Sequence, residues 1–163
     1  MRAINTSIKG FLSSSLYIVL VSTVAAQDAG QVTAVQKYYD YLSNPTSKEL
    51  RAELEKVMAD DWVSIGDYIE EDDADRDDFF SVAKDTAKAV PDMSWRIEET
   101  LVDGDRVIVR GRVTGTPKSP FYGMKTNGGS FDIMSIDIHT IENNQITKTY
   151  SVEDWLGAIM QLE

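Results

Sequence analysis

The sequence predicts an α+β protein in which helices come first and an antiparallel sheet follows. Apolar residues recur at helical spacing up to Pro91, and the apolar period changes to two after Asp92. Near the end, two strand-like runs flank the dipeptide Asn143-Asn144, which suits a tight hairpin turn. Helices followed by a run of strands are typical of the α+β class. Because no internal repeat or linker interrupts this order, we expect one domain.

The segment 1–26 has the pattern of a secretory signal peptide that is removed from the mature protein. Arg2 and Lys9 give it a basic start, the run 11–26 is apolar and small, and Val24-Ala25-Ala26 suits cleavage. A membrane anchor is the less favoured alternative, because the apolar run is shorter than the ~20 residues that a membrane span needs. We therefore expect a single domain over residues 27–163 that is secreted or periplasmic.

Three helices are expected before Pro91. The first covers residues 31–43, the second follows the capping sequence Thr46-Ser47-Lys48-Glu49, and the third runs from Asp75 to about Ala89. The acidic run 70–78 loosely resembles a calcium-binding loop, but it lacks the central glycine and the distal glutamate in register. The favoured interpretation is a solvated loop whose Asp75 caps the third helix.

The second half of the chain predicts strands. Alternating apolar residues indicate strands over 95–101 and 107–113, joined by a turn at Asp103-Gly104. Phe121-Tyr122 lies in a loop over 117–129, where it is expected to cover an opening. The final hairpin pairs 133–141 with 146–152, and a short helix with Trp155, Ile159 and Leu162 on one face follows.

The final hairpin also predicts where chemistry could occur. If Asn143 and Asn144 are the two turn residues, Ile141 faces Ile146, and side chains beyond the turn alternate between the two faces of the sheet. One face then collects Ile133, Asp137, His139, Lys148, Tyr150 and Asp154. This face holds the chain's single histidine, so we expect it to form the floor of a small-molecule pocket. Further pocket or core residues are expected to be Trp62, Tyr68, Trp95 and Phe121.

Composition excludes several classes of function. The formal net charge is −11, which disfavours binding to nucleic acids and to anionic membranes. The sequence contains no cysteine, so a disulfide, a thiolate nucleophile and a cysteine-ligated zinc are impossible. One histidine and a distant acidic run make no recognisable ligand set, so we expect no metal site.

Several segments resemble a known family in their order and spacing. They are Pro91-Asp92-Met93, residues 103–110, Thr114-Gly115-Thr116, residues 136–141 and Asp154-Trp155-Leu156-Gly157. Together they resemble the SnoaL-like branch of the nuclear-transport-factor-2-like superfamily from about Val32 to Leu162. The resemblance implies a cone, in which a curved antiparallel sheet is wrapped by N-terminal helices around a deep pocket. It also implies polyketide cyclase-like or isomerase-like proton transfer without a cofactor, or non-catalytic ligand binding on the same fold.

The resemblance gives roles to Asp154 and His139, and the predicted hairpin pairing, which puts Tyr150 opposite Asp137, gives one to Tyr150. Each role has a structural alternative. Asp154 is in the chain position of the family's acid/base aspartate, although an aspartate before a short helix also acts as its cap. His139 either polarises a carbonyl group or belongs to a structural hydrogen-bond network. Tyr150 either donates to an enolate oxygen or closes a structural hydrogen bond. The expected ligand is a small apolar carbonyl compound, and a homodimer is expected to cover Ile136 and Ile138.

Overall fold

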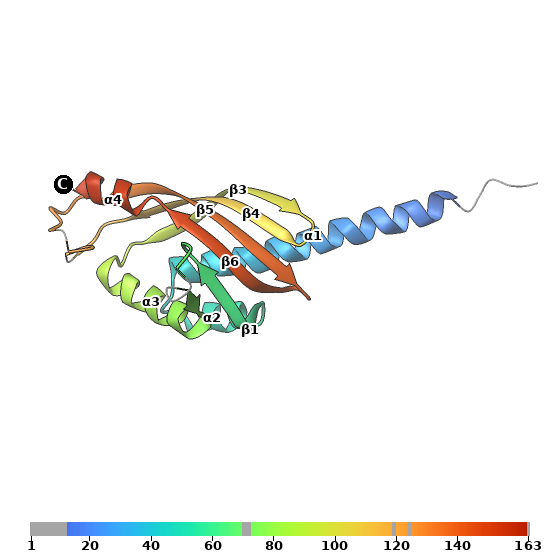
Figure 1. Ribbon diagram of the computed structural model, residues 1–163, viewed down its shortest axis with the longest axis horizontal. Helices are drawn as coiled ribbons and strands as arrows, with labels where there is room; N and C mark the ends of the chain where they lie inside the picture. The colour runs from blue at the N-terminus through green and yellow to red at the C-terminus, as the bar shows by residue number, and fades with distance from the viewer. Residues whose placement is uncertain (1–12, 70–72, 119, 124, 163) are drawn as a thin grey trace, which may run out of the picture.

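The structure is a computed structural model that describes residues 13–69, 73–118, 120–123 and 125–162, with side chains from residue 28 onward. Part of the acidic run, residues 70–72, lies outside the described residues. The elements in chain order (Figure 1) are α1 (Ser13–Ser43), α2 (Lys48–Glu55), β1 (Met58–Ile65), β2 (Ala74–Asp75), α3 (Arg76–Ala89), β3 (Ser94–Asp103), β4 (Arg106–Gly115), β5 (Phe131–Glu142), β6 (Gln145–Glu153) and α4 (Trp155–Leu162).

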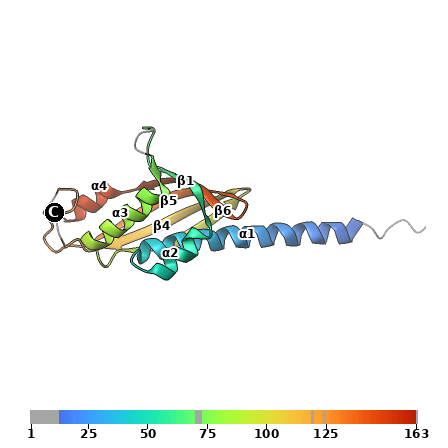
Figure 2. The ribbon, with the colours of Figure 1, turned by 90° about the horizontal axis from the view of Figure 1, so that it is seen from below.

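The described strands form one six-stranded sheet in the order β2-β1-β6-β5-β4-β3. All neighbouring strands are antiparallel except β1 and β6, which pair in parallel. Helices α1, α2 and α3 lie on one side of the curved sheet, and α4 lies at its end (Figures 1 and 2). The predicted α+β class, with a curved sheet covered by N-terminal helices, is therefore confirmed, and the mostly antiparallel sheet contains one parallel pair, β1 with β6.

Local sequence signals explain the ends of the elements. Ser47 caps α2 by accepting a hydrogen bond from the Leu50 amide, and Asp75 caps α3 by accepting from the amides of Asp77 and Asp78. Asn143 and Asn144 have φ angles of 51° and 62°, which asparagine tolerates better than most residues. The predicted second and third helices and the predicted hairpin turn are therefore confirmed.

Two clusters of buried apolar side chains hold the helices against the sheet. The larger cluster joins α1, α2 and α3 to β1 and β4, with Tyr39, Trp62 and Phe80 among its largest fully buried members. The smaller cluster joins Phe121, Phe131 and the α4 residues Ala158 and Leu162. Fully burying large apolar side chains stabilises a fold by about 1.5–3 kcal/mol each, so these clusters fix the sheet against the helices.

The predicted pairing of the final hairpin is correct at the turn and wrong beyond it. Ile141 pairs with Ile146 as expected, but the register shifts between Thr140 and Ile141, so that His139 pairs with Thr149 and Asp137 with Ser151. A β-bulge of this kind inserts one extra residue and moves every following side chain to the opposite face. Beyond the bulge, the inward residues of β6 are therefore Thr149, Ser151 and Glu153, and the predicted Lys148, Tyr150 and Asp154 do not face inward.

Helix α1 begins at Ser13, earlier than the predicted start at Gln31, and it extends beyond the sheet (Figure 1). Within the described part of the chain, no helix is long and apolar enough to cross a membrane. The signal peptide stays a prediction, and its residues 1–12 lie outside the described part.

Candidate functional site

A cavity of about 850 Å³ lies between the helices and the concave side of the sheet. Its lining is mostly apolar, and its aromatic members are Tyr38, Phe79, Trp95, Phe121, Tyr122 and Trp155. The charged side chains among the described lining residues are Asp85, Asp137 and Glu153, so no cation from these residues faces the cavity. In the same described residues, no group of acids and histidine could hold a metal ion. The cavity is therefore walled mostly by apolar side chains, and the charged groups among its described lining residues are carboxyl groups.

The carboxyl groups of the buried Asp137 and the half-buried Glu153 meet at one serine on the wall of this cavity. Asp137 on β5 is 1% exposed, and it faces Ser151 across the strand pair. The Ser151 hydroxyl contacts Oδ1 of Asp137 and lies 2.9 Å from Oε1 of Glu153. A serine hydroxyl has one proton to donate. Both contacts can therefore be hydrogen bonds at the same time only when one of the two carboxyl groups is protonated.

The environment of the pair favours the retention of a proton. Burial raises the pKa of Asp137, although hydrogen bonds from Ser151 and Tyr39 act in the opposite direction. Burial also raises the pKa of Glu153, and the negative charge of Asp137 raises it further. Two carboxyl groups that interact this closely titrate as a pair. The pair is thus suited to hold one proton at a pH where free carboxyl groups are ionised.

A chain of buried polar side chains leads away from Asp137 into the core. The hydroxyl of Tyr39 on α1 donates to Oδ2 of Asp137 at 2.6 Å and lies 3.4 Å from Nε2 of His139. Nδ1 of His139 lies 3.0 Å from the Thr149 hydroxyl, which accepts a hydrogen bond from the indole of Trp62 at 3.1 Å. All four side chains are at most 1% exposed. His139 therefore lies behind the cavity wall.

Burial lowers the pKa of His139 to about 3. In the unfolded chain its pKa is ~6.5, so between these values the unfolded state binds a proton that the folded state does not. Stability from this group is therefore fully present above about pH 6.5 and is lost as the pH falls towards 3. The raised pKa values of Asp137 and Glu153 have the opposite effect on stability. Above the unfolded-state pKa values of these carboxyl groups, the folded state binds more protons than the unfolded state, so their contribution to stability falls as the pH rises.

The stability difference between the wild type and His139→Gln is expected to shrink on acidification from about pH 7 to about pH 4. The change is up to about 1.4 kcal/mol per pH unit, because glutamine does not titrate. Urea unfolding followed by circular dichroism at each pH measures it, and the difference between the two proteins largely removes the contribution of the carboxyl groups. A difference that stays constant or grows towards acid pH would contradict the buried neutral imidazole.

The structure brings part of the predicted site together. Asp137, Trp95 and Phe121 line the cavity. His139 and Trp62 are buried behind it, and Ile133 packs in the smaller apolar cluster. The predicted convergence of Asp137 and His139 on the inner side of the sheet is thus observed, whereas the roles of these residues stay predictions.

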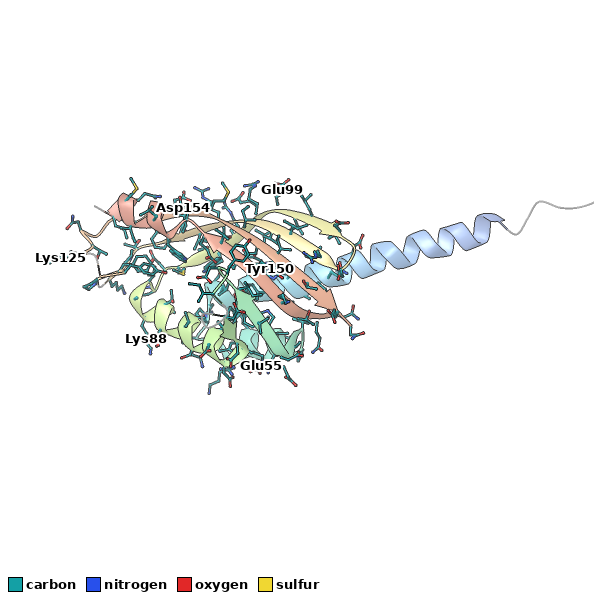
Figure 3. The ribbon with its side chains drawn as sticks, in the orientation of Figure 1. Glu55, Lys88, Glu99, Lys125, Tyr150 and Asp154 are labelled. Atoms are coloured by element: carbon teal, nitrogen blue, oxygen red, sulfur yellow. The ribbon has the colours of Figure 1, made fainter. Side chains whose placement is uncertain are left out.

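Three predicted site residues lie elsewhere. Tyr150 is 37% exposed on the outer side of the sheet, with the Lys148 amine 5.8 Å from its ring, because the bulge turns it outward. Tyr68 is fully exposed in the loop after β1. Asp154 is exposed at the start of α4 (Figure 3), where its Oδ1 accepts a hydrogen bond from the Gly157 amide at 2.9 Å. The expected shared face is therefore wrong for Lys148, Tyr150 and Asp154. Asp154 instead caps α4, as the alternative in the sequence analysis stated.

Sequence reasoning missed Ser151, Glu153, Thr149 and Tyr39. A signal for the first three was present, because β6 has polar residues at alternate positions over 149–153, and β5 has Ser135, Asp137 and His139 in the same pattern. Pairing the polar side of one strand with the polar side of the other would have required a bulge near the turn. Tyr39 gave no such signal, because a tyrosine on the apolar face of a helix is typical of a core.

The chain matches the family model described as SnoaL-like polyketide cyclase over residues 32–162. TsrD from Streptomyces laurentii is 20% identical with a TM-score of 0.68, and the match covers 82% of this chain and 95% of TsrD. IdmH, a putative polyketide cyclase from Streptomyces antibioticus, is 20% identical with a TM-score of 0.69, covering 81% of this chain and 97% of IdmH. A SnoaL-like protein from Jannaschia sp. CCS1 is 19% identical with a TM-score of 0.70, covering 82% and 92% of the two chains. No curated protein sequence matches the chain significantly.

Proposed function

Because the chain belongs to the SnoaL-like polyketide cyclase family, we propose that it binds a small, largely apolar carbonyl compound and transfers protons to and from it without a cofactor. The observation that supports this proposal is the Ser151 hydroxyl placed between the carboxyl groups of Asp137 and Glu153 on the cavity wall. This pair takes the place of Asp154, which the structure puts in solvent.

Cyclisation by aldol addition and isomerisation through an enol both need the same two proton transfers. A base removes a proton from the carbon next to the carbonyl group, and an acid protonates the oxygen that becomes negative. A carboxyl pair that holds one proton supplies both groups at once. The apolar lining assists, because a raised carboxyl pKa brings the acid and the base closer to the working pH.

The second candidate function is ligand binding without catalysis. One observation favours it, namely that both oxygens of Asp137 already accept hydrogen bonds, from Tyr39 and from Ser151. To act as a base, Asp137 must give up one of these hydrogen bonds when it accepts the proton of the ligand. The two candidates differ in turnover and agree in binding.

Solvent-deuterium exchange of 2-tetralone, an apolar ketone with acidic α-hydrogens, tests the proposal. In deuterated buffer the wild-type protein is expected to accelerate loss of the α-hydrogen signal in proton NMR over the buffer rate. Binding without acceleration would favour the non-catalytic function. Binding itself is followed by fluorescence, since Trp95 and Trp155 line the cavity.

The cavity is expected to discriminate against anions. At neutral pH, tetralin-2-carboxylate should bind at least tenfold more weakly than 2-tetralone, a difference of about 1.4 kcal/mol or more. The reason is that the described lining residues offer carboxyl groups and no cation to the ligand. Fluorescence titration of the two compounds, which are similar in size, measures the ratio. Equal or tighter binding of the carboxylate would contradict the assignment.

We also propose that the protein is exported with removal of its N-terminal segment and that it forms a homodimer. The outer side of the sheet exposes Met134, Ile136, Tyr150 and Val152, an apolar surface that a second copy of the chain would cover. Native mass spectrometry of the protein expressed with its N-terminal segment tests both parts. The expected species is a dimer of chains that begin near Gln27, and an uncleaved chain or a monomer would reject the corresponding part.

A further inference from the structure

We propose that the buried hydrogen-bond chain from Trp62 to Tyr39 gives the two carboxyl groups unequal roles, with Asp137 held as the carboxylate base and Glu153 carrying the proton as the acid. This inference rests on the proposed function, because it concerns the same pair. It also makes His139 a positioning residue, since this side chain acts on the ligand only through Tyr39 and Asp137.

Trp62 sets the direction of donation in this chain of hydrogen bonds. An indole N–H can only donate, so the Thr149 hydroxyl must be the acceptor of this bond. Thr149 is fully buried and must place its own proton on another acceptor. The acceptor within reach among the described side chains is Nδ1 of His139, at 3.0 Å. The Thr149 hydroxyl therefore donates to His139.

This bond sets the tautomer of His139. A neutral imidazole carries one N–H, and Nδ1 is already an acceptor, so the proton must be on Nε2. Nε2 then donates to the Tyr39 hydroxyl, and the Tyr39 proton points to Oδ2 of Asp137. The Tyr39–Asp137 separation of 2.6 Å is in the range of a hydroxyl bonded to an ionised oxygen. Each member of the chain therefore donates towards Asp137.

The reverse direction fails at Thr149. With the proton on Nδ1 of His139, Thr149 would accept two hydrogen bonds while its own buried proton had no acceptor among the described residues. A Tyr39 hydroxyl that donated to His139 would also need a proton on Asp137 to keep the 2.6 Å contact, and the Thr149 end excludes this arrangement. The observed distances are therefore consistent with one direction.

Ser151 contacts the other carboxyl oxygen of Asp137 and links it to Glu153. With Asp137 ionised, Ser151 donates to its Oδ1, and the contact between Ser151 and Glu153 needs a proton on the Glu153 carboxyl group. The titratable groups around Asp137 are Tyr38 and Tyr39 from α1, His139 from β5 and Glu153 from β6. None of these groups is a cation, so hydrogen bonds decide which carboxyl group stays ionised. Asp137 accepts from both Tyr39 and Ser151, whereas the Trp155 side chain is the other donor that favours an ionised Glu153.

This assignment orders the proton transfers. The C–H bond next to the carbonyl group breaks, its proton goes to Asp137, and its electron pair forms the enolate. The Glu153 proton goes to the enolate oxygen. Asp137 then returns a proton to Glu153 through Ser151, whose hydroxyl accepts one proton and gives up another. Atoms and charge balance, and the pair returns to its starting state.

Nitrogen-15 NMR of the wild type tests the direction without any substitution. His139 is the only histidine of the chain, so its ring signals need no separate assignment. The expected result at neutral pH is a neutral ring with hydrogen on Nε2 and a hydrogen-bonded, unprotonated Nδ1. A proton on Nδ1, or a charged ring, would overturn the proposal.

Carbon-13 NMR titration of the side-chain carboxyl groups tests the consequence for Asp137. Tyr39→Phe removes the last donor of the chain and should raise the pKa of Asp137 by about one unit or more. Tyr41→Phe is the matched control, because the Tyr41 hydroxyl is equally buried and has no hydrogen-bond partner among the described residues. An unchanged pKa of Asp137 in Tyr39→Phe would overturn the assignment. A wild type in which Asp137 holds the proton and Glu153 is ionised would also overturn it.

These measurements need neither a ligand nor turnover, so they separate the two proposals. If the carboxyl groups titrate as described and 2-tetralone is not exchanged, the proposed catalysis fails and the assignment stands. If exchange occurs and Glu153 is ionised at neutral pH, the assignment fails and the catalysis stands.

Discussion

Asp137→Asn is expected to reduce the protein-catalysed exchange of the 2-tetralone α-hydrogens by roughly 10²–10⁴-fold, the range that a positioned acid or base contributes. An amide has almost the same shape as the carboxyl group and cannot take a proton from carbon at neutral pH. The apolar cavity wall remains, so the affinity for 2-tetralone should change little. Proton NMR of the exchange and fluorescence titration of binding give the two quantities separately.

Asp154→Asn is the matched control for this substitution. Asparagine is also a good helix cap, and its oxygen can keep the bond to the Gly157 amide, so α4 should be undisturbed. Exchange by Asp154→Asn is expected to equal that of the wild type. If Asp154→Asn loses exchange while Asp137→Asn keeps it, the aspartate that the family resemblance indicates is the acid/base group and the carboxyl pair is structural.

Trp62→Ala is expected to lower the free energy of unfolding by about 3–5 kcal/mol, the usual cost of removing a large buried aromatic side chain. Trp62 is fully buried in β1, with ring centroids 5.1 Å from Phe79 on α3 and 6.3 Å from Tyr38 on α1. It therefore joins two helices to the sheet at the place where the hydrogen-bond chain begins. Urea unfolding followed by far-ultraviolet circular dichroism measures the loss.

Trp62→Phe separates packing from hydrogen bonding at the same position. It keeps much of the apolar volume and removes the indole donor to Thr149, so a loss of about 0.5–1.5 kcal/mol is expected. A loss in Trp62→Ala no larger than that in Trp62→Phe would show that Trp62 contributes little packing to the core.

Most of the fold could be predicted because its signals are local. The capping residues Ser47 and Asp75 indicate where the second and third helices begin, and Asn143-Asn144 indicates the last turn. The parallel pairing of β1 with β6 could not be predicted in this way. It joins segments that are far apart in the sequence, and neither segment contains a signal for the direction of its partner.

The site was predicted less well because one bulge changes its composition. The inward positions of β5 follow from simple alternation, so Asp137 and His139 were correctly placed on the inner side. On β6, the shift between Thr140 and Ile141 exchanges Tyr150 for Ser151 and brings Glu153 inward. The contact of Tyr39 with Asp137 depends on how α1 packs on the sheet, which the local sequence does not specify.

The central claim is that Asp137 and Glu153 share one proton through Ser151, and the most direct measurement counts the protons on these two carboxyl groups in the wild type. In a carbon-13 titration of the ligand-free protein, the pair is predicted to hold one proton at neutral pH, because the Ser151 hydroxyl contacts both carboxyl groups and can donate to only one of them. Burial raises the pKa of both groups, so this proton should be released above the range of ordinary carboxyl groups. Two fully ionised carboxyl groups at neutral pH, each titrating as a free side chain does, would contradict the account.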